Sequence, residues 1–206
     1  MSYRLLRWLL SANRAHLRPL DGPEVIREIP CQKQFMLVTG TAEREAKFQQ
    51  MKRDAAKDGS AGSFFAFHGS SADNWHGILH LGLKNMSGSK YMTSGKAFGS
   101  GIYMAEKLSV ALLYAKRTSK PHWPKARNTG EAVIVAVCEV VPRKLNTWEQ
   151  NSQQYFVVPD EECVATRYLL INPDIARSGK SDVSAKDIAD RLHEKTAMSE
   201  GPMAFY

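Results

Sequence analysis

The apolar run AVIVAVCEVV, at residues 132–141, constrains the fold of this chain more than any other segment. Its valine and isoleucine side chains favour extended backbone, and a short apolar run of this kind is typical of a buried strand. We therefore expect Ala132–Val141 to form a strand at the centre of a sheet.

Shorter segments predict the rest of the sheet and the helices around it. Further strands are expected at Gln34–Val38, Ser63–Phe67, Gly101–Met104, Tyr155–Val158 and Val164–Ile171. Helices are expected at Glu43–Lys57, from Asn74 to about Leu81, from about Leu108 to Ala115, and from about Ser184 to Ala197. Asp73 is placed to cap the second helix and Gly82 to end it. Because helices precede and interrupt a mostly β second half, the predicted fold class is α+β.

The length of 206 residues fits one domain with appended segments. We expect N-terminal helices and a lead-in segment at 1–60, a core at 61–173 and a C-terminal helical extension at 174–206. Arg4 and Arg7 interrupt the apolar residues of Met1–Leu10. This pattern favours an amphipathic helix packed on the domain over a targeting segment.

Composition argues against several classes of protein. No apolar run approaches the ~20 residues of a membrane-spanning helix, so no membrane partner is expected. The three cysteines are widely spaced and form no CxxC or Cys/His pattern, which argues against a zinc site and a disulfide framework. Free cysteines fit a reducing compartment, and we expect the protein in the cytoplasm or the nucleus.

The formal net charge of +7 is concentrated in one segment, 107–129. Its lysine and arginine residues, which no acidic residue interrupts, are Lys107, Lys116, Arg117, Lys120, Lys125 and Arg127. Such a segment can attract nucleic acid or other polyanions. A solvated basic loop without a partner explains the same pattern equally well.

The common nucleotide and metal motifs are missing: the chain has no GxGxxG after a strand, no GxxxxGK[ST] and no HExxH. Polar and glycine residues instead gather at strand ends, in His68-Gly69-Ser70 and in Gly99–Tyr103. A histidine that closes a strand is by itself more often a capping or core residue than a ligand contact. His76 and His80 have a metal-ligand spacing but no third ligand nearby, so a solvated helix face is expected and no metal.

Four blocks give these residues a context: FHGS, NWHGILHLGL, AFGSGIYMAE and YFVVPDEECVATRYLLI. In this order and spacing, over about Phe64 to Ile171, they resemble the catalytic core of the poly(ADP-ribose) polymerase family. The lead-in segments LRWLLSANRAHL and KQF look like those of fungal and monotransferase-type members. The resemblance implies the ADP-ribosyltransferase fold, a split and mostly antiparallel β-sheet with flanking helices. It also implies NAD+ as the substrate, bound in an open crevice, and no metal.

Matching positions imply roles for individual residues. His68 would bond the 2′-hydroxyl of the adenosine ribose, and Ser70 would lie against the same ribose. Gly69 would offer its backbone N–H and C=O to the nicotinamide carboxamide, because a glycine permits close approach to the backbone. Tyr103 and Tyr114 would sandwich the nicotinamide ring.

Two positions depart from the polymer-forming members. Tyr155 stands where those members carry a glutamate that activates the acceptor during chain elongation. A phenol with a pKa near ~10 cannot act as that base at neutral pH. The catalytic set His68, Tyr103 and Tyr155 is therefore the pattern of members that add a single ADP-ribose. Ala111 stands where many members have a serine that bonds the nicotinamide amide.

The resemblance predicts a mono-ADP-ribosyltransferase that releases nicotinamide and modifies a protein Asp or Glu or a nucleic-acid end. Two alternatives remain open. The chain could be a catalytically weak or inactive module that binds NAD+ or ADP-ribose. It could also be an RNA 2′-phosphotransferase, although residues 1–60 do not resemble the winged-helix domain that usually precedes such enzymes. It could also be a fragment of a larger protein.

Overall fold

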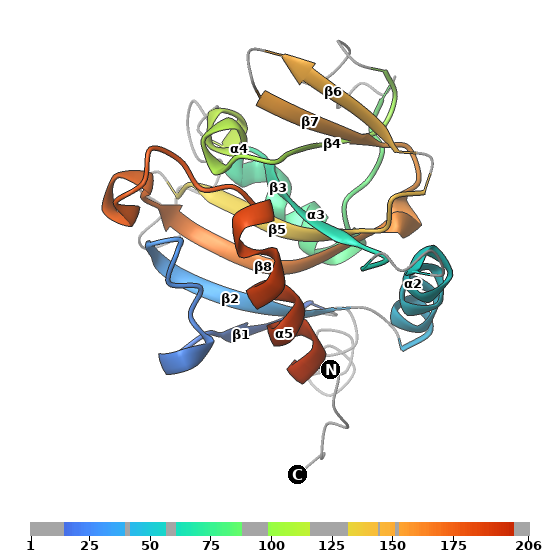
Figure 1. Ribbon diagram of the computed structural model, residues 1–206, viewed down its shortest axis with the longest axis horizontal. Helices are drawn as coiled ribbons and strands as arrows, with labels where there is room; N and C mark the ends of the chain where they lie inside the picture. Colours follow the sequence, from blue (N-terminus) through green and yellow to red (C-terminus); the bar gives the residue numbers. More distant parts are fainter. Residues whose placement is uncertain are drawn as a thin grey trace, which may run out of the picture.

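The computed structural model describes residues 15–39, 42–56, 61–87, 99–115, 132–143, 145–150 and 153–199. One eight-stranded sheet has the order β1-β2-β8-β5-β3-β4-β7-β6, and its paired strands are antiparallel (Figure 1). The strands are β1 (Ala15–Pro19), β2 (Cys31–Thr39), β3 (Phe64–Gly69), β4 (Ile102–Ala105), β5 (Ile134–Val140), β6 (Asn146–Gln150), β7 (Gln153–Val158) and β8 (Val164–Pro173). The α-helices are α2 (Ala42–Ala55), α3 (Trp75–Leu81), α4 (Leu108–Ala115) and α5 (Ala189–Ser199). This arrangement confirms the α+β class.

The strand β5 lies at the centre of the sheet, between β3 and β8, as the apolar run predicted. Side chains alternate between the two faces of a strand. On β5, Val135 and Val137 belong to one core cluster, whereas Ala136 and Cys138 belong to the other. A strand covered on both faces favours apolar side chains at almost every position, which explains the run that Glu139 alone interrupts.

The sheet is divided between β3 and β4. A single residue pair, Phe67 with Ala105, joins these two strands. By contrast, β3 pairs with β5 continuously from Phe64 to Gly69. Strands β4, β7 and β6 therefore form a smaller part that stands apart from the larger part (Figure 1). This divide is the split that the resemblance implied.

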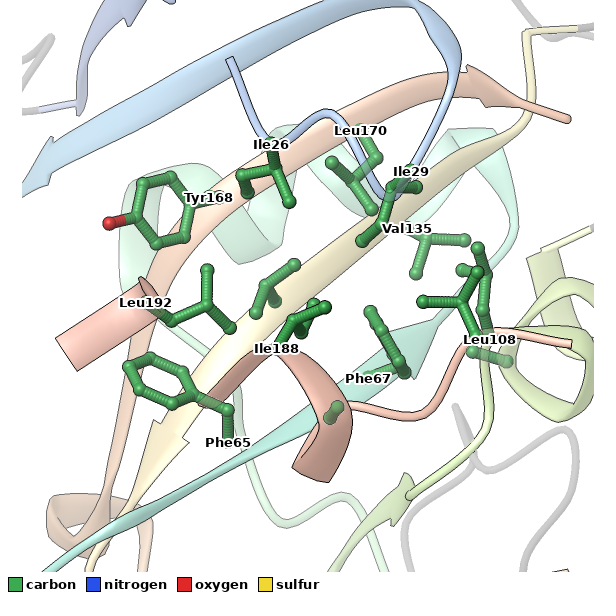
Figure 2. Close-up of a cluster of buried hydrophobic side chains, with 14 of the residues drawn as sticks. Ile26, Ile29, Phe65, Phe67, Leu108, Val135, Tyr168, Leu170, Ile188 and Leu192 are labelled. Atoms are coloured by element: carbon green, nitrogen blue, oxygen red, sulfur yellow. The ribbon is translucent and has the colours of Figure 1, made fainter. Parts of the chain in front are cut away.

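Helices cover both faces of the sheet. The first core cluster holds most of the buried side chains of α4 together with those of the C-terminal segment. Figure 2 shows Leu108 and Ile188 near Phe67, and Leu192 near Phe65 and Tyr168. The second cluster places Phe48 of α2 and Trp75 of α3 on the opposite face. The two faces thus have separate cores, and β3 contributes to both.

Residues from 1–60 and from 174–206 share core clusters with residues of 61–173. Strands β1 and β2, from within 1–60, extend the main sheet, and β2 pairs with β8. In the C-terminal segment, Ile188 is 3% exposed and Leu192 0%, so these residues fill the core instead of being appended to it. The helix expected at Met1–Leu10 lies outside the described residues, as does most of the basic segment 107–129.

The start of α3 differs from the expectation, whereas its end agrees. Asp73 does not cap the helix, because it lies inside a 3-10 turn, Ala72–Asn74, that leads into α3. The side chain of Asn74 donates to Ser70 Oγ at 2.9 Å instead of capping the helix. Gly82 ends α3 with a φ of 80°, a conformation that favours glycine, and its N–H donates to the Ile78 carbonyl at 2.8 Å.

A buried charge network holds α2 against the sheet. Glu139 of β5 is fully buried and accepts bonds from Lys52 Nζ at 2.7 Å, Ser63 Oγ at 2.7 Å and Arg167 Nε at 2.8 Å. The other end of Arg167 binds both carboxylate oxygens of Glu45 on α2, at 2.8 and 2.9 Å. Burial alone would raise the pKa of Glu139, but Arg167 and Lys52 hold it below the ordinary value. The carboxylate therefore stays charged inside the protein.

Candidate functional site

A cavity of about 430 Å³ opens at the divide between β3 and β4. Strands that share one residue pair can diverge, and the gap between them is bordered by α3 on one side and α4 on the other. All seven residues singled out from the sequence line this cavity: His68, Gly69, Ser70, Tyr103, Ala111, Tyr114 and Tyr155. They come from β3, β4, α4 and β7, and from the residue after β3.

His68 and Tyr103 are joined across the divide. The Nδ1 atom of His68 lies 2.8 Å from the backbone oxygen of Tyr103. A carbonyl oxygen can only accept, so Nδ1 carries the proton and donates it. Burial lowers the pKa of His68, and the bond to Tyr103 offsets this only in part. The imidazole is therefore neutral at pH 7, and its Nε2 atom is a hydrogen-bond acceptor.

The ring of Tyr103 is also fixed at its far end. Its hydroxyl donates to the Gly99 carbonyl oxygen at 2.7 Å. On β4, the backbone of Tyr103 pairs with Val157 of β7. The residue is thus held by three elements, and its aromatic ring lines the cavity in a fixed orientation.

Gly69 is required for packing as well as for any contact with a ligand. A Cβ atom at this position would lie 1.8 Å from the Ala111 carbonyl oxygen, which no side chain tolerates. The backbone of β3 therefore touches the backbone of α4 directly, and the small, buried Ala111 permits this. The contact fixes the distance between Gly69 and Tyr114, which lies on the next turn of α4.

Tyr155 reaches the cavity from the smaller part of the sheet. Its backbone pairs with Ala105 of β4. Burial raises the pKa of the Tyr155 phenol, and the nearby Tyr114 raises it further. At neutral pH the hydroxyl is protonated, so it can donate a hydrogen bond but cannot remove a proton.

The rim of the cavity is anchored to the turn between β7 and β8. Lys84 pairs with Glu161 at 2.6 Å, and the other oxygen of Glu161 accepts from the Asn85 backbone N–H at 2.8 Å. Ser87 accepts from the Gly101 N–H at 3.0 Å, which ties the two described ends of the loop together. These contacts hold the open side of the cavity in place.

Several lining residues were not singled out from the sequence. Among them are Lys84 and two exposed apolar side chains, Leu81 and Met86, which are 56% and 44% exposed. Their position within or just after the block NWHGILHLGL, which ends at Leu83, was the available signal. Exposed apolar side chains beside a cavity fit a ligand with an aromatic group.

Other candidate features lie elsewhere. His76 and His80 stack on the exposed face of α3, with ring centroids 6.4 Å apart. Within the described residues, no group of three or more potential metal-ligating side chains comes together. The described helices are also too short or too polar to cross a membrane.

Comparisons with known proteins agree with this geometry. A family model described as the poly(ADP-ribose) polymerase catalytic domain matches residues 33–141. Human protein mono-ADP-ribosyltransferase PARP8 is 26% identical over 211 residues, which cover 91% of this chain and 24% of PARP8. Human protein mono-ADP-ribosyltransferase PARP16 is 29% identical over 151 residues, or 61% of this chain and 42% of PARP16. Mouse PARP8 is 27% identical over 180 residues, and this chain spans 20% of it. The chain therefore spans a quarter or less of the PARP8 proteins.

Proposed function

Since this chain belongs to the poly(ADP-ribose) polymerase catalytic-domain family, we propose that it transfers a single ADP-ribose from NAD+ to an acceptor and releases nicotinamide. The observation that carries the proposal is the composition of the cavity. Among the described residues that line it, the one carboxylate is Asp73. By the resemblance, Tyr155 would stand at the position of the elongating glutamate. The names of the relatives, mono-ADP-ribosyltransferases, support the same reaction.

The lining residues fit NAD+ without a metal. The neutral His68 offers Nε2 as an acceptor for the 2′-hydroxyl of the adenosine ribose, and Ser70 lies beside it. Gly69 would offer its backbone N–H and C=O to the nicotinamide carboxamide, as the resemblance implies. The rings of Tyr103 and Tyr114 can enclose the pyridine ring, a contact worth about 1 kcal/mol per ring beyond the buried area.

The proposed reaction needs no protein base when the acceptor is an anion. The bond between the nicotinamide nitrogen and the ribose breaks, and both bonding electrons leave with the nitrogen. Nicotinamide departs as a neutral molecule, so no acid is required, and the ribose passes through an oxocarbenium-like state. A carboxylate oxygen of the acceptor then forms the new bond to this carbon, and the products are nicotinamide and an ADP-ribosyl ester. The protein contributes mainly by holding NAD+ and the acceptor in line.

An anionic acceptor fits the protonated Tyr155 phenol, which cannot remove a proton from an acceptor hydroxyl at neutral pH. Protein Asp and Glu side chains qualify, and a terminal phosphate of a nucleic acid is the second class. The cytoplasm or the nucleus is the proposed location, supported by three free cysteines, of which Cys138 and Cys163 are buried.

The test combines nicotinamide release with the mass of the modified acceptor. Labelled NAD+ should give nicotinamide and acceptors that carry one ADP-ribose each, and His68→Ala should reduce both at NAD+ concentrations below saturation. His76→Ala is the matched control, because His76 lies on the exposed face of α3 and does not line the cavity. A ladder of long chains would contradict the proposal. Binding of NAD+ without release of nicotinamide would instead identify a non-catalytic binding module.

A further inference from the structure

The C-terminal segment is joined by hydrogen bonds to the start of α4, the helix that carries Ala111 and Tyr114. The backbone N–H of Leu108 donates to the Val183 carbonyl oxygen at 2.9 Å, and the N–H of Ala185 donates to the Glu106 carbonyl oxygen at 2.9 Å. Lys107 and Ser184, between these contacts, form an isolated antiparallel bridge. The Ser184 hydroxyl also donates to Glu106 Oε1 at 2.8 Å. Residues 183–185 thus lie antiparallel to residues 106–108.

Asp182 accepts hydrogen bonds from the start of α4, although it lies 73 residues from Ser109 in the sequence. Its Oδ1 atom accepts from the Ser109 backbone N–H at 3.1 Å, and its Oδ2 atom accepts from the Ser109 hydroxyl at 2.5 Å. The Val183 N–H donates to the same Oδ1 at 2.8 Å, which fixes the carboxylate. The first N–H groups of a helix lack partners within the helix, and a negative charge there is favourable. Asp182 therefore caps α4 from another part of the chain.

The segment that bears Asp182 is itself firmly seated. Val183 and Ala185 are 1% and 0% exposed and belong to the same core cluster as Leu108, Ala111 and Ala115 of α4. Further along, Ile188 and Leu192 enter this cluster (Figure 2). The cap is consequently part of a rigid layer and not of a loose tail.

We propose that Asp182 is a positioning residue for the nicotinamide end of the cavity, acting through α4. The inference rests on the proposed function, because it takes Gly69, Tyr103 and Tyr114 as the nicotinamide contacts. The seat of α4 against Gly69 at Ala111 sets the distance between Gly69 and Tyr114, so a displaced α4 would change that distance. His68 and Ser70, which would meet the adenosine ribose, make no described hydrogen bond to α4 or to the C-terminal segment. Loss of the cap should therefore weaken binding of nicotinamide and leave binding of ADP-ribose unchanged.

The experiment compares two ligands on matched variants of the full chain. In Asp182→Ala we expect the inhibition constant of free nicotinamide to rise about fivefold, the effect of a typical lost cap, with the Kd of ADP-ribose unchanged by calorimetry. Asp182→Asn should give a smaller shift in the same direction, because asparagine can still cap the Ser109 N–H but lacks the negative charge. Asp174→Ala is the control: Asp174 caps a 3-10 turn of the same segment through the Ala176 N–H and does not contact α4.

The outcomes separate this inference from the proposed function. Two results in Asp182→Ala would overturn the role of Asp182 and leave the proposed function intact. One is an unchanged inhibition constant of nicotinamide, and the other is an equal loss of affinity for nicotinamide and for ADP-ribose. A wild-type chain that binds neither ligand would contradict the proposed function itself. If Asp182→Ala does not fold, Ser109→Ala removes only the hydroxyl contact and should give a smaller shift in the same direction.

Discussion

The Nδ1 atom of His68 donates a hydrogen bond to the backbone oxygen of Tyr103, 2.8 Å away, across the divide of the sheet. The bond orients the imidazole and selects its tautomer, so that Nε2 is the acceptor. It also links β3 to β4 beside the single residue pair of these strands. One contact thus serves both the candidate site and the cohesion of the fold.

The first prediction concerns the removal of this imidazole. We expect His68→Ala to weaken NAD+ binding about tenfold, because a hydrogen bond to the ribose and the link to Tyr103 are both lost. Calorimetry with NAD+ measures the effect, and His76→Ala should bind as the wild type does. Equal affinity of wild type and His68→Ala would remove His68 from the site.

The second prediction concerns pH. Burial lowers the pKa of His68 below its ordinary value of about 6.5. Between the folded and the unfolded pKa, His68 is therefore protonated in the unfolded chain but not in the folded protein. The contribution of His68 to stability is thus fully present above about pH 6.5 and is lost as the pH falls from there through the folded pKa. NAD+ affinity should hold through about pH 6.5 and fall only as the pH drops through the folded pKa, which lies below that value, because protonation turns Nε2 into a donor. Affinity that rises on acidification would contradict the assigned tautomer.

The third prediction separates a positioning phenol from a catalytic base. The raised pKa of Tyr155 keeps its hydroxyl protonated at neutral pH. Tyr155→Phe should therefore lower kcat less than about threefold, whereas loss of a true base costs about 100-fold or more. Nicotinamide release, followed from pH 7 to 9, should show the same profile for both proteins. A rise of wild-type activity across this range that Tyr155→Phe lacks would show that the phenolate is the base.

The fourth prediction concerns the contact between β3 and α4. Gly69→Ala should destabilise the protein by about 3 kcal/mol, since the added methyl group overlaps a backbone oxygen that cannot move alone. Chemical denaturation gives the free energy of unfolding. Gly77→Ala is the matched control, because no atom lies within 4 Å of its Cβ position. On helix propensity the control should be stabilised by about 0.5–1 kcal/mol.

The fifth prediction concerns the buried charge network. Glu139→Ala leaves Lys52 and Arg167 without their shared carboxylate, and breaking a buried pair costs about 3–5 kcal/mol. Because the folded pKa of Glu139 lies below its ordinary value, this stability is present above about pH 4.5 and is lost as the pH falls through the folded pKa. Glu43→Ala breaks only the exposed pair with Lys47 and should cost less than about 0.5 kcal/mol. A similar loss of unfolding free energy in Glu139→Ala and Glu43→Ala would show that the burial of Glu139 does not increase the cost of breaking its ion pairs.

Strong local patterns made much of the fold predictable. The bounds of α4 agree with the expectation, and β5 lies at the centre because its run of β-branched residues suits no other place. The seven candidate residues were found through the resemblance, and the structure brings them to one cavity. Their contact roles remain predictions.

Edge strands were not predictable from the chain alone. Strand β6, with the sequence NTWEQ, is polar and is extended because it pairs with β7, and β1 likewise pairs with β2 and ends at Pro19. The propensity of such segments is weak, and pairing decides their conformation. For the same reason, the four-residue spacing of Ile188 and Leu192 indicated an apolar helix face but not the surface that it covers. The hydrogen bonds between Asp182 and Ser109 join residues that are far apart in the sequence, so no local sequence pattern predicts them.

The single residue pair between β3 and β4 has a consequence for any occupant of the cavity. His68 and Gly69 belong to the larger part of the sheet, whereas Tyr103 and Tyr155 belong to the smaller part. A molecule that contacts all four residues connects the two parts of the sheet at the place where a single residue pair joins their strands. We therefore expect an occupied protein to resist separation of its two parts more strongly than an empty one, so that the substrate reinforces the cavity that receives it.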